Sequence, residues 1–282
     1  MEQFLFVFIH LALPVLLLID FIFRKSKSKI GLIIRTSLYM AIIFFLYTWG
    51  QWPLVGSYYL RYVMIAFLIL LLFLGWKSFS SIHQWKPLKL SQRLMATLTG
   101  IFAVLVLTMN YNALKGKNYP EGGVNLDFPL KNGTFYVASG GSSKIINNHM
   151  RSFPNAQEFA LDINKLGKYG GASKTILSHV NSDHYIFSDT VYCPCNGKIV
   201  EIKEDIQDNS SGSMNVSSED GTGNFVNIHC DQDFYVFIPH LKQNSVFVSK
   251  DMLVETGTPL GLIGISGFAQ EPHLHLQAAK YD

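Results

Sequence analysis

The chain has 282 residues, of which 49% are hydrophobic and 15% charged, so its length leaves room for two domains. Its formal net charge of +3 comes largely from two basic loops in the first third of the chain, and no nucleic-acid partner is expected. The hydrophobic content is high for a soluble protein, and the excess lies in the first 114 residues.

Residues 1–114 contain four apolar stretches, at 4–23, 32–49, 60–76 and 94–110. Each reaches, or with its flanks approaches, the roughly 20 residues that cross a hydrocarbon core as a helix. The first is not a cleaved signal peptide, because its apolar run is too long, no basic region precedes it and no small-residue cleavage site follows. The sequence therefore predicts an all-α region of about four transmembrane helices, in contact with the lipid bilayer.

The loops between these helices predict their orientation. The loop after the first helix and the loop between the third and fourth are basic, with Arg24, Lys25, Lys27, Lys29 and Arg35 in one and Lys77, Lys86, Lys89 and Arg93 in the other. The loop between the second and third helices has no basic residue before Arg61 and is rich in Trp and Tyr. Basic loops face the cytoplasm, so both termini and the C-terminal half are predicted to lie outside a bacterial cytoplasmic membrane.

Two ionisable residues, His10 and Asp20, lie within the first apolar stretch. Intramembrane ionisable groups can mark a functional site. Asp20 stands near the end of the stretch and His10 is uncharged at neutral pH, so we favour snorkelling or a helix–helix contact.

Residues 115–133 are polar and contain Gly and Pro, which predicts a linker. Residues 134–282 contain short runs of β-forming residues with turn residues between them, at 134–137, 159–163, 197–202, 224–228 and 234–238. Long amphipathic helical patterns are absent from the sequence of this half, so it is predicted to be an all-β domain. Residues 225–229 and 234–238 are expected to pair as a hairpin, and 209–223 to form an exposed loop.

The chain has three cysteines, Cys193, Cys195 and Cys230. The Cys-Pro-Cys spacing is too close for the usual zinc motif, and an odd count leaves at least one thiol unpaired. Either Cys193 or Cys195 can pair with Cys230 in an oxidising exterior. The alternative is that all three are buried free thiols that act as small hydrophobic side chains.

The C-terminal segment carries a candidate metal site. His273 and His275 point to the same face if the segment is a β-strand, and they follow a glycine-rich run with glycines at 257, 261, 264 and 267. Asp162 lies inside the apolar strand 159–163, where a charge must be paired or metal-bound. A hydrolytic zinc site needs about three protein ligands, an open position, a proton acceptor and an oxyanion donor.

Three motifs together carry a family resemblance: Asn148-His149 thirteen residues before Asp162, then Tyr235-Val-Phe-Ile-Pro-His240-Leu241, then Ser266-Gly267 and Pro272-His273-Leu-His275. Over about 134–277 the chain resembles the lysostaphin-type, LytM-like zinc endopeptidases. The spacing of thirteen is closer to the β-lytic branch than to the commoner branch, where His precedes Asp by four. At that nearer position this chain has Glu158.

The resemblance implies a fold, a cofactor and a set of residue roles. The fold is an antiparallel β-sheet or sandwich of the duplicated hybrid motif type. Zinc (Zn2+) would be held by His149, Asp162 and His275, with Glu158 as a less favoured substitute for His149. His240 and His273 would be unligated and catalytic, one as the general base and the other as a donor to the oxyanion, in either order.

Each of these residues also has a structural explanation when taken alone. His273 could be a surface residue, His240 could end a strand, and Asp162 could pair with a lysine. His179, His184 and His229 do not match the family motifs and are interpreted as structural, with His184 beside Asp183 as a weak candidate for supporting a ligand.

The sequence predicts a membrane-anchored zinc metalloendopeptidase that hydrolyses peptide bonds in peptidoglycan stems or cross-bridges. One alternative is a non-catalytic LytM-like regulator or binding module of cell-wall remodelling. Another makes the membrane helices the functional unit, a sensor or transporter with an appended domain. The sequence ends seven residues after His275, which fits either a compact version of the domain or a truncated one. It identifies no protein partner.

Overall fold

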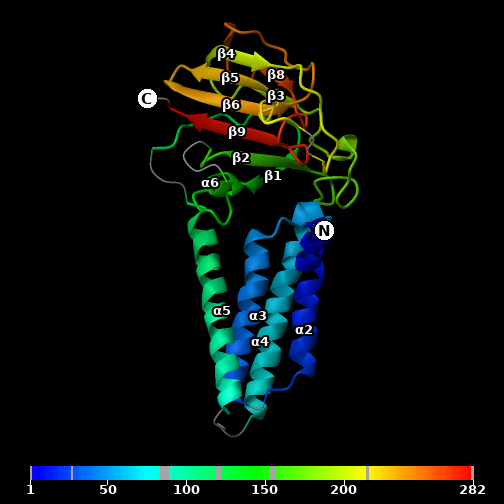
Figure 1. The fold of residues 1–282 in the computed structure, drawn as a ribbon, viewed down its shortest axis with the longest axis vertical. Helices are drawn as coiled ribbons and strands as arrows, with labels where there is room; N and C mark the ends of the chain where they lie inside the picture. Colours follow the sequence, from blue (N-terminus) through cyan, green and yellow to red (C-terminus); the bar gives the residue numbers. More distant parts are fainter. Residues whose placement is uncertain are drawn as a thin grey trace. The chain divides into compact units, whose positions relative to one another are not determined.

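A computed structural model describes residues 2–26, 28–82, 89–118, 122–152, 157–213 and 216–280. The chain divides into two compact units, residues 1–115 and 116–282. In chain order, the helices of the first unit are α1 (Glu2–Val7), a π-helical turn (Phe8–Ala12), α2 (Leu13–Phe23), α3 (Lys29–Trp49), 3-10 turns (Trp52–Val55 and Tyr58–Leu60), α4 (Arg61–Ser81) and α5 (Leu90–Lys115). The helices α2 to α5 are labelled in Figure 1.

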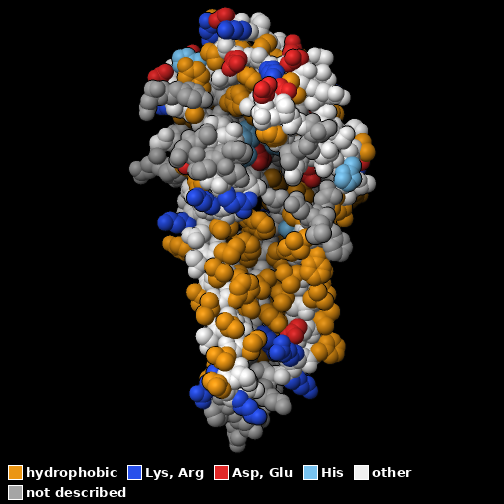
Figure 2. Space-filling view, viewed as in Figure 1, with side chains coloured by type: hydrophobic (Ala, Val, Ile, Leu, Met, Phe, Trp, Pro, Cys, Tyr) orange, Lys and Arg blue, Asp and Glu red, His pale blue; other side chains and the backbone are white. Residues whose placement is uncertain are grey.

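The described residues of the first unit include four helical segments that are long and apolar enough to cross a membrane. They are Leu5–Phe23, Lys29–Trp49, Tyr58–Ser81 and Leu90–Lys115. This confirms the prediction of four long apolar helices, and the unit fits a membrane region; hydrophobic side chains cover most of its visible face (Figure 2). The helix α5 is longer than the predicted 94–110, because hydropathy detects only the apolar middle of a helix and not its polar ends.

Both ionisable residues of the first apolar stretch make polar contacts within the first unit. The Nδ1 of His10 lies 2.8 Å from the Phe6 carbonyl oxygen, and its Nε2 accepts a hydrogen bond from the Gln51 backbone N–H. The Tyr39 hydroxyl donates to the Asp20 carboxylate, which also lies 3.7 Å from Arg35. A helix–helix contact therefore accounts for Asp20, while His10 contacts the backbone of its own helical segment and of the loop after α3.

The second unit is an antiparallel β domain with a short helix, α6 (Asn148–Ser152), and a 3-10 turn (Asn181–Asp183). Its strands are β1 (Thr134–Ser139), β2 (Leu161–Leu166), β3 (Thr190–Tyr192), β4 (Gly197–Lys203), β5 (Asn224–Cys230), β6 (Phe234–Leu241), β7 (Leu253–Val254), β8 (Pro259–Leu262) and β9 (Leu274–Ala279). Seven form one sheet in the order β1-β2-β9-β6-β5-β4-β7, and β3 pairs with β8. The predicted all-β class is confirmed; β3, β7 and β8 have four residues or fewer, too few to show an alternating pattern.

The strand register confirms the predicted hairpin and makes β9 an interior strand of the sheet. In the hairpin, Cys230 pairs with Phe234 across residues 231–233. The strand β9 pairs with β2 on one side and with β6 on the other (Figure 1). Side chains from the inner face of these strands form the core, together with the buried side chain of Leu130.

Part of the predicted linker packs on the β domain. The Asp127 backbone N–H donates to the Pro194 carbonyl, and the Tyr192 N–H donates to the Pro129 carbonyl. Leu130 is 5% exposed and belongs to the core. The extended backbone of this segment has no regular repeat, so Gly and Pro content was the only signal that its sequence offered.

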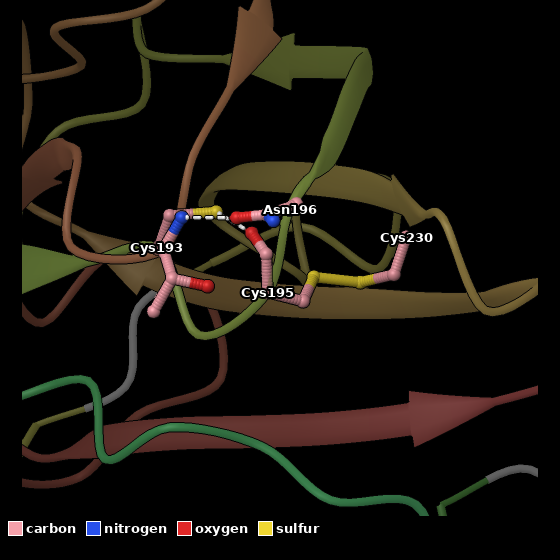
Figure 3. Close-up of a disulfide and its surroundings, with 5 residues drawn as sticks. Cys193, Cys195, Asn196 and Cys230 are labelled. Carbon is pink, nitrogen blue, oxygen red and sulfur yellow. Dashed lines mark hydrogen bonds between the residues drawn. A yellow bond between two sulfur atoms is a disulfide. The ribbon is translucent and has the colours of Figure 1, made fainter.

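A disulfide joins Cys195 to Cys230, with 6.0 Å between their Cα atoms (Figure 3). It ties the start of β4 to the end of β5. The remaining cysteine, Cys193, is buried, and its thiol donates to the Cys195 carbonyl at 3.0 Å. Burial raises the pKa of that thiol, as expected for an unreactive core cysteine.

Removing this disulfide is expected to destabilise the β domain. The bond closes a loop of 35 residues, for which the chain-entropy model gives a loss of about 4 kcal/mol of unfolding free energy. We expect Cys195→Ser with Cys230→Ser to lower the thermal unfolding temperature of the domain by many degrees. The comparison is Cys193→Ser under non-reducing conditions. An unfolding temperature unchanged by the double substitution would contradict the pairing.

Candidate metal centre

The sheet brings the predicted ligands together from distant parts of the chain. Asp162 on β2 pairs directly with His275 on β9 in the antiparallel register. Residues opposite each other in such a pair have their Cβ atoms about 5 Å apart on the same face. The short helix α6 adds His149 beside them.

The donor atoms of these three residues converge. The Nε2 of His149 lies 2.8 Å from one oxygen of the Asp162 carboxylate, and the Nδ1 of His275 lies 3.0 Å from the other. One ligand atom from each residue can be chosen so that all lie within 4.8 Å of one another. The two imidazole rings meet edge to face at a centroid distance of 4.6 Å.

The cluster is chemically suited to zinc. Two imidazole nitrogens and a carboxylate oxygen are typical zinc ligands, and tetrahedral bonds of 2.0–2.1 Å place the ligand atoms about 3.3 Å apart, close to the separations seen here. Two ring nitrogens of the cluster, Nδ1 of His149 and Nε2 of His275, are buried and have no hydrogen-bond partner among the described residues. A buried nitrogen without a partner is unfavourable, and a group bound there would relieve that cost.

The electrostatics of the cluster keep its carboxylate charged. Burial alone would raise the pKa of Asp162, but His273, His149 and His275 together hold it well below its usual range. The pKa of His275 is lowered, chiefly by burial. A charged carboxylate is the form in which Asp162 can bind a metal cation.

A second group of histidines shares His275. His240, at the end of β6, and His273, just before β9, have ring centroids 5.5 Å apart, and their nitrogens converge with one of His275. The Nε2 of His273 lies 3.5 Å from the Asp162 carboxylate. All five predicted site residues are thus brought together, while their individual roles stay predictions.

The backbone and hydrogen bonds of His240 fix its ring. Its Nδ1 lies 2.8 Å from the Ser266 carbonyl oxygen, so Nδ1 carries the proton and donates it. Burial, with His273 and His275 nearby, lowers the pKa of His240 to about 3. The ring is therefore neutral at pH 7 and its Nε2 has a free electron pair.

The residue Ser266 is the centre of a buried network that supports His240. Its hydroxyl donates to the Leu241 carbonyl at 2.7 Å and accepts the Asn224 backbone N–H at 2.9 Å. The Asn224 side-chain amide also donates to the Leu241 carbonyl. These bonds hold His240 at a φ of +62°, in the left-handed region that non-glycine residues rarely adopt. The sequence analysis placed Ser266 in a family motif and Asn224 at the start of a strand but gave neither a role, because small polar residues next to glycine resemble ordinary turns.

The tight packing around this network depends on Gly267. Its φ is +73°, and a Cβ there would lie 2.4 Å from the Gly223 backbone nitrogen. Of the glycine-rich run, Gly267 and Gly257, at φ +88°, adopt backbone conformations that favour glycine. Gly264 is required instead by close approach, because a Cβ at that position would lie 2.4 Å from the Lys242 Cα.

Gly267→Ala is expected to destabilise the domain by about 2 kcal/mol or more, since strain and clash add. Gly122→Ala is the matched control: its φ is +93°, but no described atom lies within 4 Å of an added Cβ. Thermal unfolding of the two variants separates the clash from the backbone strain. Equal unfolding temperatures would show that the loops accommodate the methyl group.

The three other histidines of the β domain lie outside the cluster. The ring of His229 stacks on Tyr235 and is partly exposed. The Nδ1 of His179 contacts the Ser211 carbonyl, and the Nε2 of His184 contacts the Ser211 hydroxyl. Neither potential metal-binding group among the described residues contains His184 or Glu158, so no metal contact supports the predicted supporting role of His184 or the substitute role of Glu158.

Comparison with known proteins gives a family for this domain. A sequence model of peptidase family M23 matches residues 186–282. This range includes His240, His273 and His275 but begins after His149 and Asp162. The assignment of these two residues to the site therefore depends on the geometry of the structure alone. A search of curated proteins finds no match.

Several solved structures are similar to the chain. A zinc-containing peptidase from Vibrio cholerae is 16% identical, with 58% of this chain and 41% of that chain covered and a TM-score of 0.31. The catalytic domain of lysostaphin from Staphylococcus simulans is 20% identical, with 40% of this chain and 81% of that chain covered and a TM-score of 0.26. Pseudoalterin, an M23 metalloprotease from the deep sea, is 15% identical, with 56% of this chain and 72% of that chain covered and a TM-score of 0.34.

The chain spans between about one third and three fifths of the length of the first three similar structures. At these TM-scores the likenesses add nothing to the family assignment, which comes from the sequence match. Residues 186–282 of this chain are a domain of peptidase family M23, the LytM and lysostaphin family, and its N-terminal apolar helices fit a membrane region.

Proposed function

We propose that the protein is a membrane-anchored zinc metalloendopeptidase that hydrolyses peptide bonds of peptidoglycan stems or cross-bridges. The observation that carries this proposal is the convergence of a three-residue ligand set with a neutral histidine whose Nε2 is free to accept a proton. A structural cluster would not require both features in one place.

In this proposal His149, Asp162 and His275 hold zinc. When bound, zinc polarises the peptide carbonyl and lowers the pKa of a coordinated water to about 7. The buried His240 accepts the proton from the attacking water at Nε2, because its Nδ1–H is committed to the Ser266 carbonyl. The Ser266 contact also orients the ring toward the cluster.

The second catalytic residue, His273, is assigned to the developing oxyanion. Its Nδ1 lies 2.7 Å from the Glu271 carbonyl oxygen, which fixes the ring. Its side chain is 18% exposed, so it is the more accessible of the two candidate catalytic histidines. Because Nδ1–H is held by the Glu271 carbonyl, Nε2 of this ring donates to the oxyanion in the form of the imidazole that carries both protons.

The disulfide supports the proposed location of the β domain outside the cytoplasmic membrane. Disulfides form and persist in oxidising compartments and are rare in the cytosol. The Cys195–Cys230 bond thus agrees with the orientation that the basic loops predict.

The test uses the full chain, purified in detergent micelles and incubated with purified peptidoglycan. Released fragments are identified by mass spectrometry, with and without a zinc chelator, and bound metal is measured in parallel. His275→Ala removes a proposed ligand, and His229→Ala removes a histidine outside the cluster.

We expect new peptide termini from the wild-type chain and His229→Ala, and none after chelation or from His275→Ala. Zinc bound without release of peptides would contradict the peptidoglycan substrate. A folded chain that binds no zinc would favour the non-catalytic regulator instead.

A further inference from the structure

Beside the candidate site, three loops of the β domain are joined into one rim. The loops are residues 178–184, 209–212 and 265–271. Hydrogen bonds connect them: Asn181 Nδ2 donates to the Asn209 carbonyl, the Ser211 N–H to Asn181 Oδ1, Asn209 Nδ2 to the Gly267 carbonyl, and the Gly212 N–H to the Gln270 carbonyl. Because each loop is hydrogen-bonded to another, the three loops form one connected unit and not a set of independent turns.

The rim ends at an acidic residue, Glu271. It is partly buried, and it stands two residues before His273, whose ring contacts its carbonyl oxygen at 2.7 Å. Among the described residues, no hydrogen bond or ion pair reaches the Glu271 carboxylate. Burial raises the pKa of this carboxyl group, and His184, His273 and His179 oppose the shift.

One ring nitrogen of each of the three imidazoles near Glu271 contacts a group other than its carboxylate. The Nε2 of His184 contacts the Ser211 hydroxyl at 2.9 Å and the Ser178 carbonyl oxygen at 3.2 Å. The Nδ1 of His179 contacts the Ser211 carbonyl oxygen at 3.0 Å. A carboxylate that is partly removed from water without a donor is unfavourable in the free protein, and a cation that binds to it relieves that cost.

We propose that Glu271 binds a primary ammonium group of the substrate close to the scissile bond, so that the enzyme selects peptides with a positive charge there. The inference rests on the proposed function, because it assigns a specificity residue to that site. Glu271 lies two residues from His273, and one residue of extended chain spans about 3.5 Å. The ammonium group therefore belongs to a residue at or next to the cleaved bond.

A metal ion is a poorer occupant than an ammonium group. Both groups of potential metal ligands among the described residues centre on His275, and neither includes Glu271. A single carboxylate with no converging ligand atoms suits a cation that brings its own hydrogen-bond donors, as an ammonium group does with three. The ammonium can be a free amino terminus or a lysine-type side chain.

The test compares four forms of a short peptide of alanine, glycine and one lysine: unmodified, acetylated at the amino terminus, acetylated at the lysine Nε, and acetylated at both. Binding of each is measured to the full chain in detergent after metal removal, so that no hydrolysis is needed. Variants are Glu271→Gln, which removes the charge, and Glu271→Asp, which keeps it. Glu255→Gln removes a carboxylate outside the rim.

We expect the wild-type chain and Glu255→Gln to bind one ammonium-bearing form about tenfold more tightly than the doubly acetylated peptide. Glu271→Gln should lose this preference and Glu271→Asp should keep part of it. The singly acetylated peptides identify which ammonium group is bound. Equal binding of all four peptides by the wild-type chain, or a preference kept by Glu271→Gln, would overturn the inference.

The same variants separate this inference from the proposed function. If peptidoglycan is cleaved but Glu271→Gln does not change the preference for ammonium-bearing peptides, only the role of Glu271 is wrong. If no peptide is cleaved and the charge-dependent binding remains, the hydrolase is wrong and the ammonium site stands.

Discussion

Asp162→Asn is expected to leave the β domain folded but without bound zinc and without peptidase activity. The amide has the shape of the carboxylate but no negative charge. Asp162 contacts both His149 and His275 and lies 3.5 Å from His273, so its charge is the common partner of all three rings. Loss of a supporting residue already costs 10- to 100-fold in metal affinity, and loss of a ligand costs at least as much.

The matched control is Asp189→Asn. Asp189 also carries a partly buried ion pair, 2.7 Å from Lys165, but it lies outside the cluster. We expect this control to bind zinc and cleave peptidoglycan at the wild-type rate, while losing some stability. Metal analysis and peptide release are measured on both variants. Full zinc occupancy in Asp162→Asn would show that this carboxylate is not a ligand.

His240→Gly is expected to reduce kcat by about 10²- to 10⁴-fold, the usual contribution of a general base, with zinc retained. Glycine is the informative replacement because residue 240 has a φ of +62°, which glycine adopts without strain. The substitution thus removes the imidazole and relieves the backbone. An unfolding temperature close to that of the wild-type chain is expected to accompany the loss of rate.

Ser266→Ala provides the graded comparison. It removes a buried hydroxyl that bonds to Leu241 and Asn224 but leaves the Ser266 carbonyl that holds His240. We expect a smaller fall in kcat, an unchanged KM and a lower unfolding temperature. Wild-type kcat in His240→Gly would contradict the base assignment, and the same measurement on His273→Ala then tests the reverse assignment of the two histidines.

The sequence predicted those features that short motifs or long apolar runs encode. The four apolar helices and the hairpin of residues 225–238 were readable because helix length and strand alternation are local properties. The candidate residues His273 and His275 were readable for the same reason. The pairing of His149 with Asp162 came from the family resemblance, and the structure adds the contact at 2.8 Å.

The features that the sequence did not predict depend on tertiary contacts. Ser266 contacts His240 across 26 positions of sequence, and Asn224 contacts Ser266 across 42. That the Glu271 carboxylate has no hydrogen-bond or ion-pair partner among the described residues follows only from the arrangement of the three loops in the folded domain. No local pattern distinguishes such residues from ordinary loop residues.

The pairing of β2 with β9 has a consequence for how the domain matures. Asp162 and His275 are 113 positions apart and lie opposite each other in one register. A slip by a single residue turns every side chain of β9 to the other face, and the ligand set then no longer exists. If the protein is the proposed zinc enzyme, metal uptake has to wait for β9, and zinc reinforces only the correctly paired sheet, by about 2.7 kcal/mol when free zinc is 100 times its dissociation constant. A nascent chain that pairs β9 wrongly would receive no such reinforcement and would stay open to proteolysis, so zinc supply would act as a check on folding as well as on activity.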